Sequence, residues 1–141
     1  MNQIRISGHQ ISLDIPPDIW LESYPGPLGQ VITNLINNAM FHAFEGREMG
    51  QMRITAQPLG TDRVEIRFSD NGVGISEHNL RHIFDPFFTT KMGQGGTGLG
   101  LSISFNIVTS LLGGQLHVTS TQGVGTCFII ELPLHTTLPA L

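Results

Sequence analysis

The spacing of apolar residues changes repeatedly along the chain, and these changes restrict the folds that the sequence can adopt. Apolar and polar residues alternate within 4–15, 52–68 and 116–132, which is typical of half-buried β-strands. Apolar residues recur every three or four positions over 27–44 and 99–112, which is typical of helices with one buried face. Residues 76–84 predict a short helix with Ser76 as its N-cap. The expected order, ββαββααββ, indicates an α+β domain with helices on one face of a mostly antiparallel sheet.

The length and charge of the chain exclude several classes of protein. A chain of 141 residues has the size of one domain, which we expect to span 1–141. The net charge of −4 argues against a nucleic-acid partner or contact with an anionic membrane. The single cysteine, Cys127, excludes a disulfide within the chain. No apolar run approaches the roughly 20 residues that cross a bilayer, and no signal peptide is recognisable, so we expect a cytoplasmic location.

Polar residues recur every four positions along the first long helix, at Gln30, Asn34, Asn38 and His42. Steps of four residues drift by only about 40° around a helix, so these side chains form one stripe. The stripe contains none of the charged residues that are usual on solvated helix faces. Two carboxamides one turn apart offer neutral oxygens to a magnesium ion carried by a nucleotide. An ordinary solvated face is the alternative interpretation.

Asp70 follows three apolar residues, Val64, Ile66 and Phe68, on the same face of a predicted strand. An inward-facing carboxylate must be hydrogen-bonded, because its burial without a partner is costly. Two interpretations remain open. The carboxylate caps the turn over 71–74, or it accepts a hydrogen bond from the exocyclic amine of a ligand whose flat base approaches the glycine backbone.

Five of the 17 glycines lie between Gly93 and Gly100, where a segment without periodicity passes into a helix. Backbone amides at such a helix start attract phosphate when no side chain covers them. The only lysine, Lys91, precedes this cluster and could supply the cationic charge that a triphosphate needs. The segment 85–97 therefore predicts either a functional lid or a disordered segment.

Five motifs together resemble a known family. They are NLINNA at 34–39, DNGVGI at 70–75, FDPFFTTK at 84–91, GTGLGL at 96–101 and GVGT at 123–126. They are similar, in this order, to the N box, first glycine box, F box, second glycine box and closing motif of the sensor histidine kinases. The chain is identified as a catalytic ATP-binding domain of that family, within the GHKL superfamily. The resemblance implies the two-layer α/β sandwich of the Bergerat type, a mixed and mostly antiparallel sheet of about five strands with three helices on one face.

The resemblance also implies ATP and Mg²⁺ as cofactors and assigns roles to individual residues. Asn38 would hold the magnesium ion with help from Asn34, and Asp70 would bind the adenine amino group. Asn38 and Lys91 would be the catalytic residues. The other residues expected to contact the nucleotide are His42, Gly72, Gly74, Ile75, Thr90, Gly96, Thr97, Gly98, Leu99, Gly100, Leu101 and Thr126.

The implied function is transfer of the γ-phosphoryl group of ATP to a histidine on a separate dimerisation and phosphoacceptor domain of the same parent protein. A response regulator would act downstream. Hydrolytic relatives have a glutamate at the position of Asn34, and a carboxamide cannot act as a base, which favours transfer over hydrolysis. None of the six histidines lies in an acceptor motif. We therefore expect a monomeric domain that cannot phosphorylate itself, cut from a homodimeric parent that could be anchored in the inner membrane.

Two alternatives stay open, and the first of them rests on a departure from the family pattern. The family usually has Lys or Arg three residues after the asparagine that binds magnesium, and this chain has Phe41 there. A nucleotide-binding regulatory module without phosphotransfer is therefore one alternative. A GHKL serine kinase, of the anti-sigma type or of the mitochondrial dehydrogenase kinase type, is the other.

Overall fold

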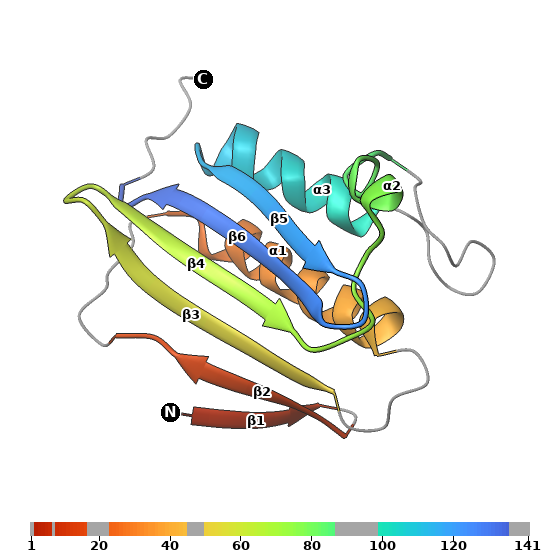
Figure 1. Cartoon of the computed structure of the whole chain (residues 1–141). Helices are drawn as coiled ribbons and strands as arrows, with labels where there is room; N and C mark the ends of the chain where they lie inside the picture. Colours follow the sequence, from red (N-terminus) through yellow and green to blue (C-terminus); the bar gives the residue numbers. More distant parts are fainter. Residues whose placement is uncertain (1, 7, 17–22, 45–49, 87–98, 136–141) are drawn as a thin grey trace.

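The computed structural model describes residues 2–6, 8–16, 23–44, 50–86 and 99–135, which form one sheet with helices packed against it (Figure 1). The strands are β1 (Asn2–Ile6), β2 (His9–Asp14), β3 (Gln51–Leu59), β4 (Arg63–Asp70), β5 (Gln115–Thr121) and β6 (Gly125–Pro133). Their order across the sheet is β1-β2-β3-β4-β6-β5, and only β2 and β3 pair in parallel. The predicted α+β class with a mixed, mostly antiparallel sheet is confirmed.

Among the described residues the sheet has six strands, the number in the predicted order ββαββααββ, whereas the family resemblance implied about five. The additional edge strand is β1, which pairs with β2 from Asn2↔Leu13 to Ile6↔His9. All five residues of β1 take part in this pairing, so the hairpin that the alternating pattern predicted extends the sheet by one strand.

The helical segments are α1 (Pro25–Asn38), η1 (Ala39–Ala43), α2 (Glu77–Leu80), α3 (Gly100–Asn106) and η2 (Ile107–Leu111). The first long helix thus begins two residues earlier than predicted, with proline in its first turn. Both long helices end in a π-helical segment, in which residues five apart are bonded. The Phe44 amide donates to the Ala39 carbonyl at 3.0 Å, and the Leu112 amide donates to the Ile107 carbonyl at 2.9 Å. The α-helical spacing did not predict these endings.

The short helix α2 is confirmed at its start and is shorter than predicted at its end. The Ser76 hydroxyl accepts a hydrogen bond from the Asn79 amide at 3.2 Å, as an N-cap does. Beyond Leu80 the chain forms turns, in which the Asp85 amide donates to the His82 carbonyl at 2.9 Å. These turn bonds replace the expected last helical residues over 81–84.

The core lies between one face of the sheet and the helices α1 and α3, which Figure 1 shows behind the strands. The residues of β4 and β6 that point to this side are fully or almost fully buried, as the period of two predicts. They are Val64, Ile66, Phe68, Phe128, Ile130 and Leu132. Val31 and Leu35 of α1 complete the layer. Among the described residues, no helix is long and apolar enough to span a bilayer.

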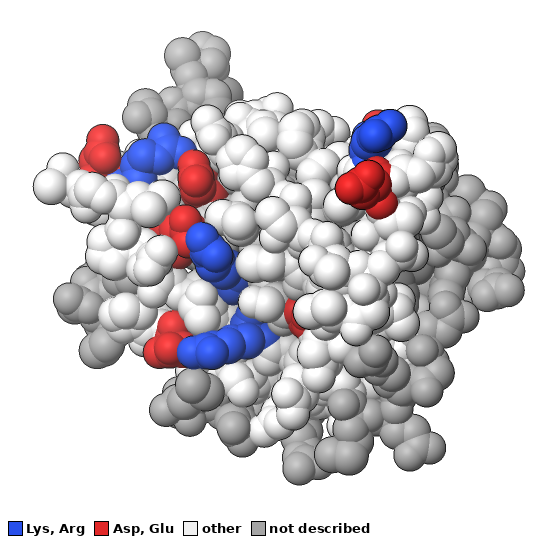
Figure 2. All heavy atoms as spheres, in the orientation of Figure 1, with Lys and Arg blue, Asp and Glu red and all other residues white. Residues whose placement is uncertain are grey.

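The other face of the sheet carries charged residues, which Figure 2 shows over the strands. Glu65 is only 7% exposed there, and its carboxylate accepts hydrogen bonds from Arg67 and from Gln57 Nε2, the latter at 3.0 Å. These contacts with Glu65 raise the pKa of the Arg67 guanidinium. Arg53 pairs with Asp14 at 3.1 Å nearer the β2 edge. Paired charges of both signs make this face unlike a nucleic-acid surface.

Candidate functional site

Asp70 is the last residue of β4, opposite Thr126 of β6 in the strand register. Its Oδ1 atom accepts a hydrogen bond from the Gly72 amide at 2.9 Å, so the carboxylate does cap the following turn. A carboxylate can accept about four hydrogen bonds, so this contact leaves it able to serve a ligand as well. The two interpretations of Asp70 are therefore compatible.

The turn after Asp70 packs against the end of η1. The Val73 amide donates to the Ala43 carbonyl at 2.9 Å. A Cβ atom on Gly72 would overlap that same carbonyl and the Ala43 side chain. Glycine at position 72 therefore lets the first glycine box lie directly on the π-helical end of the helix that carries Asn34 and Asn38.

Gly74 has a positive φ of 75° and lies against the β5–β6 turn. A Cβ atom there would overlap the Thr121 carbonyl, and the Gly123 amide of the same turn donates to the Val73 carbonyl at 2.8 Å. The first glycine box is thus held between η1 and the β5–β6 turn. This contact explains why two glycines are needed in the motif.

Ser120 connects the first glycine box to the closing motif, and the sequence analysis did not identify it. Its Oγ atom accepts from the Ile75 amide at 2.8 Å and donates to the Gly125 carbonyl at 2.9 Å. The Thr126 hydroxyl lies 2.8 Å from Ser120 Oγ. Because Ser120 has one proton and gives it to Gly125, Thr126 must be the donor in this pair. The signal available in the sequence was the period of two, which places Ser120 on the same face of β5 as Leu116 and Val118.

Asn34 joins α1 to the beginning of α3. Its Nδ2 atom donates to the Gly100 carbonyl at 3.2 Å and to Ser104 Oγ at 3.0 Å, and its Oδ1 atom accepts from Gln30 Nε2 at 2.8 Å. Ser104 is completely buried, and the sequence analysis did not identify it. At Asn34 the polar stripe of α1 is therefore partly covered by α3, whereas Gln30 is exposed.

Asn38 is the last residue of α1 and is partly exposed, one turn beyond Asn34. Phe41, in η1, is 37% exposed. Within the described ranges, no group of three or more His, Cys, Asp or Glu residues could hold a metal ion. A metal at Asn38 would therefore depend on ligands from a bound nucleotide, and Mg²⁺ is commonly bound with few protein ligands in this way.

The structure thus brings together several of the predicted site residues. Asp70, Gly72, Gly74, Ile75 and Thr126 form one connected group, which meets the helix of Asn34 and Asn38 through Ala43. Gly100 meets the same helix through Asn34, and Leu99 and Leu101 adjoin it in the chain. The remaining predicted residues lie outside the described part of the structure, or their side chains do. They are His42 (side chain), Thr90, Lys91, Gly96, Thr97 and Gly98.

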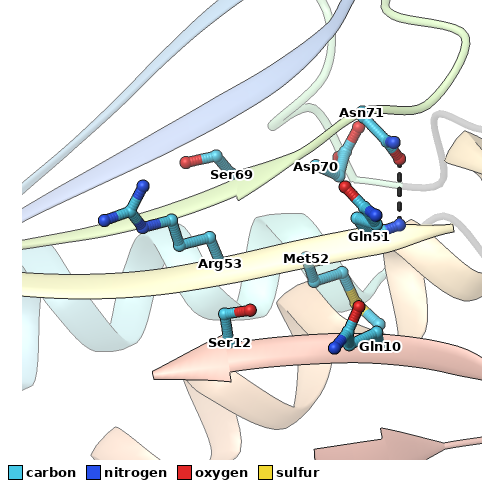
Figure 3. Close-up of a pocket in the computed structure, with 8 residues that line it drawn as sticks. All are labelled: Gln10, Ser12, Gln51, Met52, Arg53, Ser69, Asp70 and Asn71. Carbon is cyan, nitrogen blue, oxygen red and sulfur yellow. Dashed lines mark hydrogen bonds between the residues drawn. The ribbon is translucent and has the colours of Figure 1, made fainter. Parts of the chain in front are cut away.

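A separate hollow of about 420 Å³ lies at the ends of β2, β3 and β4 (Figure 3). Its polar lining includes Ser12, Arg53 and Ser69, and the Gln51 amide donates to Asn71 Oδ1 at 2.9 Å at its edge. Of the predicted site residues that the structure describes, only Asp70 lines it. The hollow therefore does not coincide with the place where the motifs meet.

Comparison with known proteins identifies the family. Residues 24–136 match the family described as histidine kinase-, DNA gyrase B-, and HSP90-like ATPases. The chain is 37% identical to sporulation kinase E of Bacillus subtilis over 133 residues, which are 94% of this chain and 17% of that protein. It is 44% identical to the sensor histidine kinase ZraS of Salmonella typhimurium over 114 residues, 81% of this chain and 23% of that protein. The chain thus spans about a fifth of the length of these relatives.

The fold agrees with this similarity. The structure of the catalytic domain of histidine kinase ThkA, in a nucleotide-free form, matches with a TM-score of 0.73 and 32% identity, over 89% of this chain and 81% of that one. The chain therefore belongs to the family of histidine kinase-, DNA gyrase B-, and HSP90-like ATPases, as a catalytic ATPase domain of the sensor histidine kinase type.

Proposed function

We propose that this domain binds ATP with Mg²⁺ and donates the γ-phosphoryl group to a histidine on a separate phosphoacceptor domain. One observation carries the proposal: the loop of Asp70 and the start of α3 both bond to the helix that contains Asn34 and Asn38. Motifs assigned to the base, the metal and the phosphates are thus adjacent. Phosphoryl transfer depends mainly on such positioning and on neutralisation of charge.

The proposed roles follow the motifs. Asn38 would bind Mg²⁺ through its carboxamide oxygen, with Asn34 assisting. Asp70 would accept a hydrogen bond from the adenine amine, and Lys91 would supply positive charge at the γ-phosphate. The other proposed nucleotide contacts are His42, Gly72, Gly74, Ile75, Thr90, Gly96, Thr97, Gly98, Leu99, Gly100, Leu101 and Thr126. Magnesium, when bound, neutralises phosphate charge, and this chain's residues orient the nucleotide that carries it.

We further propose that the domain works as a monomeric module in the cytoplasm, within a homodimeric parent protein that could be anchored in the inner membrane. The acceptor histidine belongs to that parent, and a response regulator receives the phosphoryl group. The paired charges on the open sheet face support the absence of a nucleic-acid partner.

The isolated domain is expected to bind ATP with Mg²⁺ without labelling itself, because no acceptor motif is present and Asn34 cannot serve as a hydrolytic base. Incubation with γ-labelled ATP, alone and with the separately produced acceptor domain, tests this. The label on the acceptor should be stable to base and labile to acid, and an acceptor with its histidine replaced by alanine is the control. Rapid self-labelling or steady phosphate release would contradict the proposal.

Asn38→Ala is expected to lower ATP affinity roughly tenfold in Mg²⁺ and much less in a chelator, because the carboxamide oxygen acts on the metal. Calorimetric titrations under both conditions measure the difference. Asn37→Ala, at the neighbouring exposed position of α1, is the matched control. An equal loss under both conditions would assign Asn38 to packing or to direct phosphate contact.

A regulatory module that binds ATP without transfer is the second candidate. It is favoured by Phe41, which is 37% exposed where the family usually has a cation. The transfer experiment separates the two candidates, since the module would bind ATP and leave every acceptor domain unlabelled.

A further inference from the structure

We propose that Asn34 is a positioning residue whose amide nitrogen holds the start of α3 in place against α1. The inference rests on the proposed function, because it concerns the alignment of two sides of the nucleotide site. It gives the nitrogen of Asn34 a task separate from any contact of its oxygen with magnesium.

Three polar atoms form a closed triangle between α1 and α3. Asn34 Nδ2 donates to the Gly100 carbonyl at 3.2 Å and to Ser104 Oγ at 3.0 Å. Ser104 Oγ in turn donates to the Gly100 carbonyl at 2.9 Å. The two bonds from Asn34 join α1 to α3, and they connect positions 66 and 70 apart in the sequence.

The orientation of the Asn34 amide follows from its partners. A backbone carbonyl only accepts hydrogen bonds, so the atom that faces Gly100 must be the amide nitrogen. Gln30 Nε2 donates to the opposite Oδ1 atom at 2.8 Å and holds the amide in that orientation. Ser104 is 0% exposed in the intact domain, so loss of the Asn34 donor takes one hydrogen bond from a buried hydroxyl oxygen.

The triangle lies between two parts of the proposed site. Gly100 is the first residue of α3 and belongs to the GTGLGL motif assigned to phosphate. Asn38, assigned to magnesium, lies one turn beyond Asn34 on α1. Loss of the triangle allows α3 to move relative to α1, so nucleotide affinity falls whether or not metal is present.

Substitution of Asn34 by aspartate separates the nitrogen from the oxygen. Asn34→Asp keeps an acceptor oxygen, removes both N–H donors and directs a carboxylate at the Gly100 carbonyl. We expect ADP affinity to fall about tenfold, equally in Mg²⁺ and in EDTA, at a temperature where the variant is fully folded. A purely metal-binding Asn34 would instead tolerate Asp in Mg²⁺, because carboxylates bind this ion well.

A double-mutant cycle tests the triangle itself. Asn34→Ala and Ser104→Ala should each lower ADP affinity roughly threefold to tenfold, and the combined variant should lose little more than the worse of the two. Matched controls are Asn37→Asp, which adds the same charge at an exposed position of α1, and Thr109→Val. Like Ser104, Thr109 donates its hydroxyl proton to the backbone carbonyl four residues earlier, that of Phe105 at 2.8 Å. Thr109, however, lies on η2. Both controls should bind ADP within about twofold of wild type.

Any one of three results would overturn this inference and leave the proposed function standing. They are full ADP affinity in Asn34→Asp, a loss of ADP affinity that occurs only in Mg²⁺, and additive losses of ADP affinity in the double-mutant cycle. Failure of the wild-type domain to bind ADP at all would instead contradict the proposed function. In that case the double-mutant cycle can be repeated with the free energy of unfolding, measured without nucleotide. The effects of the two alanine substitutions on that free energy should still be coupled. Additive effects would mean that the triangle does not stabilise the domain either.

Discussion

Gly74→Ala is expected to destabilise the domain by about 2–5 kcal/mol and to lower nucleotide affinity more than tenfold. Alanine at a positive φ of 75° costs about 1–2 kcal/mol. Overlap of the new Cβ atom with the Thr121 carbonyl adds roughly 1–3 kcal/mol, because the atoms that it would meet are all backbone atoms and cannot move aside as a side chain can. Urea unfolding without nucleotide measures the first effect, and ADP titration of the folded fraction measures the second.

Two other glycines separate these contributions. Gly60 has a similar positive φ of 63° in the β3–β4 turn, but a Cβ atom there would meet nothing within 4 Å. Gly60→Ala should therefore show the conformational cost alone and leave ADP binding unchanged. Gly72→Ala should show only the cost of steric overlap, because the new Cβ atom would meet Ala43. If Gly74→Ala and Gly60→Ala destabilise the domain equally, the packing of the first glycine box on the β5–β6 turn is not tight.

Asp70→Asn is expected to lower ADP affinity roughly tenfold to a hundredfold while the free energy of unfolding changes little. An asparagine oxygen can still accept from the Gly72 amide, as Asp70 Oδ1 does at 2.9 Å, so the turn remains capped. Hydrogen bonds to charged groups contribute about 1.5–3 kcal/mol, and this contribution to the adenine amine is lost. Calorimetry with ADP and urea unfolding test the two statements.

The inosine analogue of ADP makes this test specific, because it has a carbonyl oxygen where adenine has the amine. The wild-type domain should prefer ADP, and Asp70→Asn should reduce or reverse the preference, since its amide can donate to that carbonyl. Asp14→Asn removes one carboxylate from the opposite face, where it pairs with Arg53, and is the control for net charge. Unchanged ADP affinity in a folded Asp70→Asn variant would limit Asp70 to its role as a turn cap.

Most secondary structure could be predicted because it depends on residues close together in the sequence. Alternation placed Val64, Ile66 and Phe68 on the buried face of β4, and their burial confirms it. Ser76 was predicted as an N-cap and accepts from the Asn79 amide three residues later. The π-helical ends of both long helices could not be predicted, because the spacing of apolar residues in 39–43 also fits a regular α-helix.

Ser104 and Ser120 show the same limit at the candidate site. Each is an ordinary polar residue in its own element, and neither belongs to the residues that the motifs single out. Their importance comes from contacts with Asn34, 70 positions away, and Ile75, 45 positions away. No local pattern contains such pairs.

The sequence by itself determined the elements, the α+β class and the motifs that place the chain in its family, because spacing, capping and glycine content act within a few residues. Only the tertiary structure decided that Asn34 faces Gly100 and Ser104 and that the first glycine box lies on Ala43. The physical reason is that a hydrogen bond between polar groups far apart in the sequence depends on which segments pack together. That packing is set by the burial of the whole apolar core rather than by any one motif.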